Sequence, residues 1–216
     1  MSAMLVVQVS FRLHSGVHVT GEQAKLWTDK ALVVDWNEGR YPIVPATSLK
    51  GWLRASAERA LRSLGIYTCD ASSPVTICGL CPLCAVFGHP RGRSPLRFQD
   101  VRLAEARRDV RTSVSLSRYR RTAYEERLFS TEVAWSPRLE STVKGFFDTG
   151  IEAQQAAALL WLGARTGFAL GAARSRGLGW LTLEHFSAAV DRQPVALTEL
   201  STILTAFVAQ QRRVGQ

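Results

Sequence analysis

All four cysteines of the sequence lie between residues 69 and 84, in the stretch CDASSPVTICGLCPLC. Cys78, Cys81 and Cys84 follow the pattern C-x2-C-x2-C, and Cys69 precedes them. Thiolates at this spacing can turn toward one tetrahedral ion, and four thiolates are a common structural zinc set. The pattern therefore predicts a closed structural Zn²⁺ site that stabilises a loop and performs no catalysis.

Two other interpretations of the cysteines stay open at this point. Three cysteines at this spacing also occur in iron–sulfur proteins, but there the proline follows the last cysteine, whereas Pro82 follows the second last. The thiols could also be metal-free, and His89 is a reserve ligand should Cys69 lie too far away. Disulfides are not expected, because the N-terminus lacks the basic region of a signal peptide and no apolar run could span a bilayer. We therefore expect a cytoplasmic, reducing environment and no membrane partner.

The charge of the chain indicates a polyanionic partner. Lys and Arg number 27 against 18 Asp and Glu, giving a net charge of +9 and a pI near 10.0. Such a balance is typical of nucleic-acid binding. In the stretch TSLKGWLR, Ser48, Lys50 and Arg54 lie near the start of a predicted helix, where free N–H groups and the positive end of the helix dipole favour a phosphate.

Two further stretches combine arginine with residues suited to RNA. GFALGAARSRGLGW places Arg174 and Arg176 among glycines, which let backbone approach a phosphate that arginine can clamp. RTSVSLSRYRRTAYEERLF alternates arginines such as Arg118 with tyrosines, a combination that pairs charge with base stacking. Each stretch is also compatible with a solvated loop, and nucleic-acid binding is inferred because the stretches occur together.

The elements that must position these residues follow from periodicity. MLVVQVSFRL, LRFQDVRLA, LESTVKGFFD and LGWLTLEHF alternate as strands, whereas residues 47–64, 151–164 and 197–211 have helical spacing. The order β-α-β-β-α-β predicts an α+β, ferredoxin-like fold. Residues 104–139 show no steady period and are expected to be irregular.

No G-x-S-x-G, H-E-x-x-H or P-loop motif is present, and the four histidines have no catalytic spacing. Asp29 and Asp35 lie in a predicted long loop, where a carboxylate can bind a divalent ion beside a phosphodiester. From the residues alone, the prediction is a nucleic-acid binder with a zinc-stabilised loop.

Four strings resemble the RAMP superfamily, specifically the backbone subunits of type III CRISPR effector complexes. IVPATSLKGWLR is similar to that family's I-P-G-S-S-L-K-G-x-x-R element, and CPLCAVFGHPRGRSPLRFQDV to its C-x-x-C, F-G and S-x-L-x-F-x-D segment. VSLSRYRRTAYEERLFSTE resembles V-x-I-x-R…A-x-x-x-x-L-F-x-x-E, and GAARSRGLGW resembles G-x-x-x-S-R-G-x-G. Ala46 and Thr47 stand where the family has glycine and serine.

The resemblance implies one RAMP domain over residues 1–216: a ferredoxin-like, RRM-like palm with insertions at 15–46 (catalytic loop), 66–95 (zinc-binding segment) and 104–139 (a thumb-like hairpin). It implies CRISPR RNA, target single-stranded RNA, further copies or paralogues in a filament and other type III effector subunits as partners. Asp29 matches the family's loop aspartate, which supports target-RNA cleavage with Mg²⁺ or Mn²⁺ and the RNA 2′-hydroxyl as nucleophile.

The residues then expected to bind RNA are His18, Ser48, Lys50, Arg54, Arg118, Gly171, Arg174 and Arg176. Two alternatives belong to the same family. One is a structural paralogue that binds guide RNA without cleaving. The other is an endoribonuclease that processes CRISPR RNA, for which His14 or His18 would serve as general base.

Overall fold

A five-stranded antiparallel sheet forms the centre of the molecule in the computed structural model, which describes residues 2–22, 25–71 and 73–214. Positions 1, 23–24, 72 and 215–216 of the predicted domain and its insertions lie outside the described residues. The strand order is β3 (Leu96–Arg97), β7 (Arg138–Phe147), β1 (Ala3–Leu13), β8 (Leu181–Val190), β9 (Gln193–Val195). With α1 (Ala46–Ser63) after β1 and α3 (Gly150–Thr166) after β7, this is the predicted ferredoxin-like core, which is confirmed.

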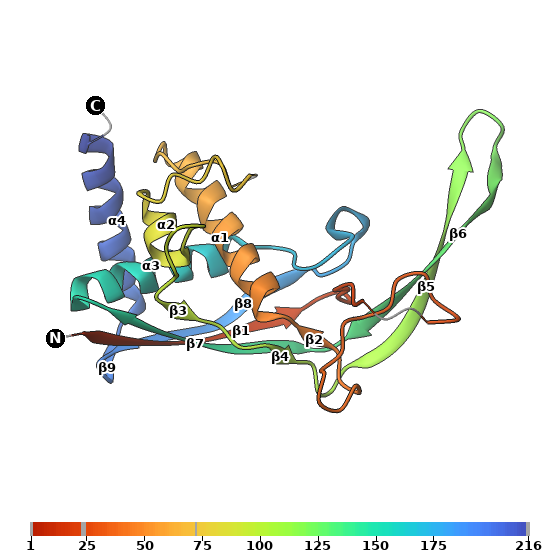
Figure 1. Cartoon of the computed structure of the whole chain (residues 1–216), viewed down its shortest axis with the longest axis horizontal. Coiled ribbons are helices and arrows are strands. Elements are labelled where there is room, and N and C mark those ends of the chain that lie inside the picture. The colour runs from red at the N-terminus through yellow and green to blue at the C-terminus, as the bar shows by residue number, and fades with distance from the viewer. Residues whose placement is uncertain (1, 23–24, 72, 215–216) are drawn as a thin grey trace.

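The helices cover one face of this sheet because the strands alternate. On β1 every second side chain from Ala3 to Leu13 is buried, and both helices pack over that face (Figure 1). Trp52 of α1 meets Phe11 edge to face at 5.3 Å between ring centroids, and its Nε1 donates to the Ala169 carbonyl oxygen at 2.7 Å. The last helix, α4 (Leu197–Val214), packs against α3, and the opposite face of the sheet stays uncovered.

The predicted strand in LRFQDVRLA is wrong as one continuous element. Leu96–Arg97 join β7 in the main sheet, whereas β4 (Val101–Arg102) pairs with β2 (Ile43–Val44) ahead of α1. Asp100 lies between the two, and its Oδ1 accepts a hydrogen bond from the Ala46 N–H at 2.7 Å. The strand breaks because this side chain turns toward the first turn of α1.

The expectation that residues 104–139 are irregular is wrong. Most of them form a long antiparallel hairpin. Its strands, β5 (Arg107–Ser117) and β6 (Thr122–Trp135), project away from the sheet and helices (Figure 1). Outside its base, nearly every residue of this ribbon is exposed on both faces. The apolar–polar alternation of a half-buried strand is therefore absent from the sequence. Among the described residues, no helix is long and apolar enough to cross a bilayer.

The close crossing of α1 and α3 depends on Gly163. A β-carbon added at Gly163 would lie 2.6 Å from the Leu53 carbonyl oxygen, whereas one added at Gly51 of α1 would meet nothing within 4 Å. We expect Gly163→Ala to destabilise the fold by about 1–3 kcal/mol, because it forces the helices apart. Gly51→Ala is the matched control and should stabilise by about 0.5–1 kcal/mol. Urea unfolding measures both, and equal effects of the two substitutions would contradict this packing.

Candidate nucleic-acid interface and metal centre

The four cysteine sulfurs converge on one point, as the spacing predicted. All lie within 4.8 Å of one another, and Cys69 Sγ is 3.6 Å from Cys81 Sγ and 3.5 Å from Cys84 Sγ. Zinc–sulfur bonds of about 2.3 Å in a tetrahedron put the sulfurs about 3.8 Å apart, so the set fits a structural zinc ion. Cys69 completes the set, so His89 is not required as the fourth ligand. This is the only group of three or more Cys, His, Asp or Glu of this kind among the residues that the structure describes.

Backbone hydrogen bonds and burial shift the pKa values of Cys78 and Cys81 in opposite directions. The Leu80 and Cys81 N–H groups donate to Cys78 Sγ at 3.4 and 3.2 Å, and these bonds lower the pKa of Cys78 to about 7. Burial instead raises the pKa of Cys81 to about 12. In the metal-free protein Cys78 is thus the first of these two to ionise, and a cation is needed to hold buried Cys81 as a thiolate.

Arg54 ties the cysteine segment to α1. Its Nη1 donates to the Gly88 carbonyl oxygen at 2.7 Å, just past α2 (Pro82–Phe87), and its Nη2 contacts Cys84 Sγ at 3.4 Å. Two turns later, Arg62 Nε donates to Thr68 Oγ1 at 2.9 Å. Arg54 was predicted to grip RNA, but its guanidinium is bound to the insertion. We infer that it positions the zinc-binding segment.

Ser48 and Lys50 remain partly exposed on the first turns of α1. Partial burial, together with the nearby Arg54 charge, lowers the pKa of Lys50. A phosphate beside Lys50 would relieve this clustering of positive charge. The pair of residues is therefore compatible with the predicted anion contact, which stays a prediction.

Asp29 is fixed on the hairpin by Ser130, a residue 101 positions away. Asp29 Oδ2 accepts hydrogen bonds from the Ser130 N–H at 2.6 Å and from its hydroxyl at 2.8 Å, and the Asp29 N–H donates to Ser130 Oγ at 2.9 Å. Lys30 continues the contact as a parallel bridge to Thr131. The Ser130 bonds lower the pKa of Asp29, so this exposed side chain is an ionised carboxylate at neutral pH.

Asp35, the other loop carboxylate, is structural. It is buried, accepts hydrogen bonds from the Glu38, Arg40 and Tyr41 N–H groups, and pairs with Arg102 at 3.2 Å. These bonds lower its pKa despite burial. Because its oxygens are saturated by the turn that it closes, Asp35 is a poor candidate for metal binding.

Glu132 and Lys25 form a buried pair at the hairpin base that sequence reasoning missed. Lys25 Nζ donates to both Glu132 carboxylate oxygens, at 2.7 and 2.8 Å, and the Leu32 N–H donates to Oε2 at 2.9 Å. These bonds lower the pKa of Glu132 despite burial. The signal was present, because Glu132 is the last residue of the string quoted above as A-x-x-x-x-L-F-x-x-E. The pair holds the Asp29 loop to β6.

His18 does not present its side chain to a ligand. It is 1% exposed, and its Nδ1 and Nε2 lie 2.6 Å from the Glu132 carbonyl oxygen and 2.9 Å from Thr20 Oγ1. Burial lowers its pKa. The predictions of direct RNA contact or general-base catalysis at His18 therefore conflict with its packing. His14 Nε2 is also bonded, to Thr182 Oγ1 at 2.9 Å.

The glycine-rich loop is held by the backbone of His18 and presents two arginines. The Ala172 N–H donates to the His18 carbonyl oxygen at 2.8 Å, and Gly171, at φ +91°, leaves no room for a β-carbon beside that oxygen. The loop then forms a short 3-10 turn, η1 (Arg174–Arg176), whose arginine side chains are both exposed. Gly171 is thus a conformational requirement of the loop, and Arg174 and Arg176 are free to meet an anion.

The candidate residues fall into three places. His18, Asp29 and Gly171 are linked through β6 and its neighbours, whereas Arg54 contacts the cysteine segment and Lys50 lies one turn before it on α1. Arg118 lies in the exposed turn between β5 and β6, at the far end of the projecting hairpin (Figure 1). Within this chain Arg118 is not brought to the other candidates.

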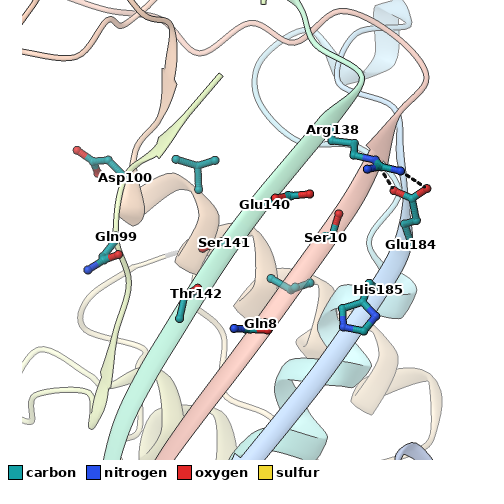
Figure 2. A pocket seen from close by; sticks show the side chains of 12 residues that line it. Gln8, Ser10, Gln99, Asp100, Arg138, Glu140, Ser141, Thr142, Glu184 and His185 are labelled. Carbon is teal, nitrogen blue, oxygen red and sulfur yellow. Dashed lines mark hydrogen bonds and ion pairs between the residues drawn. The ribbon is translucent and has the colours of Figure 1, made fainter. Parts of the chain in front are cut away.

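The uncovered face of the sheet carries a polar hollow of about 660 Å³ that no sequence pattern predicted (Figure 2). Glu140, Glu184 and His185 line it from β7 and β8, and Asp100 borders it. Arg138 Nε pairs with Glu184 Oε2 at 3.0 Å across β1. This pairing neutralises part of the acidic charge, so the hollow is not an evident cation site.

The sequence of this chain matches the model of a known protein family. The family model described as RAMPs, RAMP superfamily, matches residues 28–182, which include Asp29, the cysteine segment, the hairpin and η1. The chain belongs to the RAMP superfamily. The search of curated proteins found no match to this RAMP chain.

The RAMP chain is also similar to a chain in a solved structure, the cryo-EM structure of the type III-B Cmr-beta bound to cognate target RNA. The TM-score is 0.58 at 15% identity, over 86% of this chain and 60% of the other. Similarity at this identity shows a shared fold. This chain thus spans less than two thirds of the length of that relative.

Proposed function

We propose that this RAMP protein is a CRISPR RNA-binding backbone subunit of a type III effector complex and that it cleaves target RNA paired to the guide. The observation that carries the proposal is Asp29, an ionised carboxylate held on the surface of the projecting hairpin by Ser130 of β6. Family membership, the similar fold of a chain in an RNA-bound complex and the charge of +9 support the RNA-binding part.

Cleavage by the RNA's own 2′-hydroxyl requires few catalytic groups from the protein. The target's own 2′-hydroxyl oxygen attacks the adjacent phosphorus and gives its proton to water, and the 5′-oxygen leaves and takes up a proton from water. A 2′,3′-cyclic phosphate and a 5′-hydroxyl remain, so the protein has to orient the strand. Mg²⁺ and Mn²⁺ prefer oxygen ligands and use one or two carboxylates together with phosphate oxygens, a set that Asp29 fits. Such an ion would neutralise charge that develops at the phosphate.

The remaining partners follow from the same proposal. Arg174 and Arg176, with Ser48 and Lys50, would hold the CRISPR RNA backbone, and target single-stranded RNA would pair with that guide. Further copies or paralogues would extend the filament, beside other type III effector subunits. His18 would act indirectly, because its carbonyl and ring join the glycine-rich loop to the hairpin base.

RNA binding is tested by the salt dependence of affinity for single-stranded RNA. Each phosphate contact adds about 0.7 to the slope of log affinity against log salt. Replacing Arg174 and Arg176 with Gln should therefore flatten the slope by about 1.4. The same change at Lys144 of β7 and Arg192 in the turn between β8 and β9, both exposed, is the control and should alter the slope less. Salt-insensitive binding, or equal effects of both pairs, would count against this interface.

A further inference from the structure

A small hollow lies at the base of the hairpin, where β1 ends, β5 begins and β6 turns into β7. Its volume is about 300 Å³, and its lining includes His14, Glu105, Arg107 and Trp135. None of these residues belongs to the RNA contacts or the cleavage site proposed above. The hollow combines aromatic and charged side chains, the combination that unpaired nucleobases require.

Two exposed tryptophans mark this end of the sheet. Trp135 is 43% exposed although it packs on Gly16, where an added β-carbon would lie 3.1 Å from its Cε2 atom. Trp180 is 57% exposed and holds the His14 ring at 5.4 Å between centroids. Large aromatic surfaces left in water next to a hollow favour stacking of a flat ligand.

The polar groups of the hollow are free to read the edge of a base. Arg107 is the cross-strand partner of Trp135, so both side chains lie on one face of the hairpin. Glu105 precedes it by two residues. Within the described part of the chain, neither charged side chain has a hydrogen-bond or ion-pair partner. A guanidinium donates to base carbonyls and ring nitrogens, and a carboxylate accepts from base amines.

Backbone hydrogen bonds give the hollow a fixed frame next to the arginine loop. The Leu13 N–H donates to the Pro137 carbonyl oxygen at 3.0 Å, and the His14 N–H donates to that of Trp180 at 2.8 Å. The Gly179 N–H donates to the Gly16 carbonyl oxygen at 2.8 Å. The chain that carries Arg174 and Arg176 is thereby joined directly to the wall of the hollow. An RNA strand held by those arginines would therefore lie next to the hollow.

We propose that this hollow binds one unpaired nucleobase of RNA, which stacks on Trp135 and is held at its edge by Arg107 and Glu105. The proposal rests on the RNA-binding function proposed above and adds a base contact to contacts with phosphate. Such a base contact would fix the register of the RNA strand on the protein in addition to its path.

The test compares a short single-stranded RNA with the same RNA in abasic form, on the full chain. Trp135→Ala should weaken binding of the ordinary RNA by about tenfold and leave binding of the abasic RNA unchanged, because stacking needs a base. Trp135→Phe retains a ring and should preserve most of the affinity. Trp36→Ala is the matched control, since Trp36 is 87% exposed and lies outside the hollow.

The outcomes separate the two proposals. Tight RNA binding that a folded Trp135→Ala variant leaves unchanged, or weakens equally for ordinary and abasic RNA, overturns the base site and leaves the proposed function standing. A wild-type chain that binds neither RNA overturns both. If Trp135→Ala fails to fold, it loses binding of abasic RNA as well, and Trp135→Phe is compared instead. Equal binding of ordinary and abasic RNA by the folded Trp135→Phe variant overturns the site.

Discussion

Cys69→Ser should release the structural zinc and lower the midpoint of thermal unfolding by roughly 10 °C, since each kcal/mol corresponds to about 2–4 °C in a chain of this size. The cluster closes the segment between α1 and β3, and its buried sulfurs are core residues. Without the ion, the buried Cys81 thiol stays protonated and the segment loses its central constraint. Removal of zinc from the wild type with a chelator should give a similar shift.

Metal analysis and thermal unfolding check this prediction together. The wild type should contain one zinc per chain, and Cys69→Ser should contain none. Val75→Ser is the matched control, because Val75 is 91% exposed in the same segment. A protein that carries no metal and is indifferent to chelation would contradict the zinc site. A visible absorption band from an iron–sulfur cluster would replace zinc with the alternative that the cysteine spacing left open.

Glu132→Ala should destabilise the fold by about 3–5 kcal/mol, the usual cost of stranding one partner of a buried ion pair. The Glu132 and Lys25 side chains are 7% and 18% exposed, so solvent screens the pair little. The substitution leaves the Lys25 ammonium and the Leu32 N–H without their acceptor. Glu125→Ala, at an exposed position of the same strand, should change stability by less than about 0.5 kcal/mol.

Urea unfolding at neutral pH measures this difference, and proteolysis in the loop around Asp29 should accelerate in the Glu132 variant. The pH dependence has a defined sign, because the pKa of Glu132 is lowered from 4.5 in the folded chain. Its contribution is present above that ordinary value and is lost as the pH falls through the folded pKa. A variant as stable as the wild type, with an intact loop, would show that the pair does not anchor the loop.

The cysteine centre and the palm could be predicted from sequence because their signals are local. The x2 spacing brings Cys78, Cys81 and Cys84 together within one knuckle, and the alternation of β1 records which face is buried. The hairpin could not be predicted from periodicity, because a two-stranded ribbon exposed on both faces imposes no pattern. Only the resemblance to a family implied it.

The finer assignments depended on partners far away in sequence. Arg54 looked like a surface cation on its helix, but Gly88 and Cys84 occupy its guanidinium. His18 lies in a predicted loop, but in the fold its ring is hydrogen-bonded to the carbonyl oxygen of Glu132, 114 residues away. No local sequence pattern indicates such contacts. Only the folded structure distinguishes a residue that can bind RNA from one that positions another segment of the chain.

The most direct test of the proposed function is target-RNA cleavage by the assembled effector complex with Mg²⁺, comparing wild type with Asp29→Ala. Asp109→Ala, an exposed carboxylate on the same hairpin, is the control. We expect cleavage of the target to disappear in the Asp29 variant, while target binding and the control's cleavage persist. Cleavage at an unchanged rate would contradict this expectation and leave the chain as a guide-holding paralogue that does not cleave.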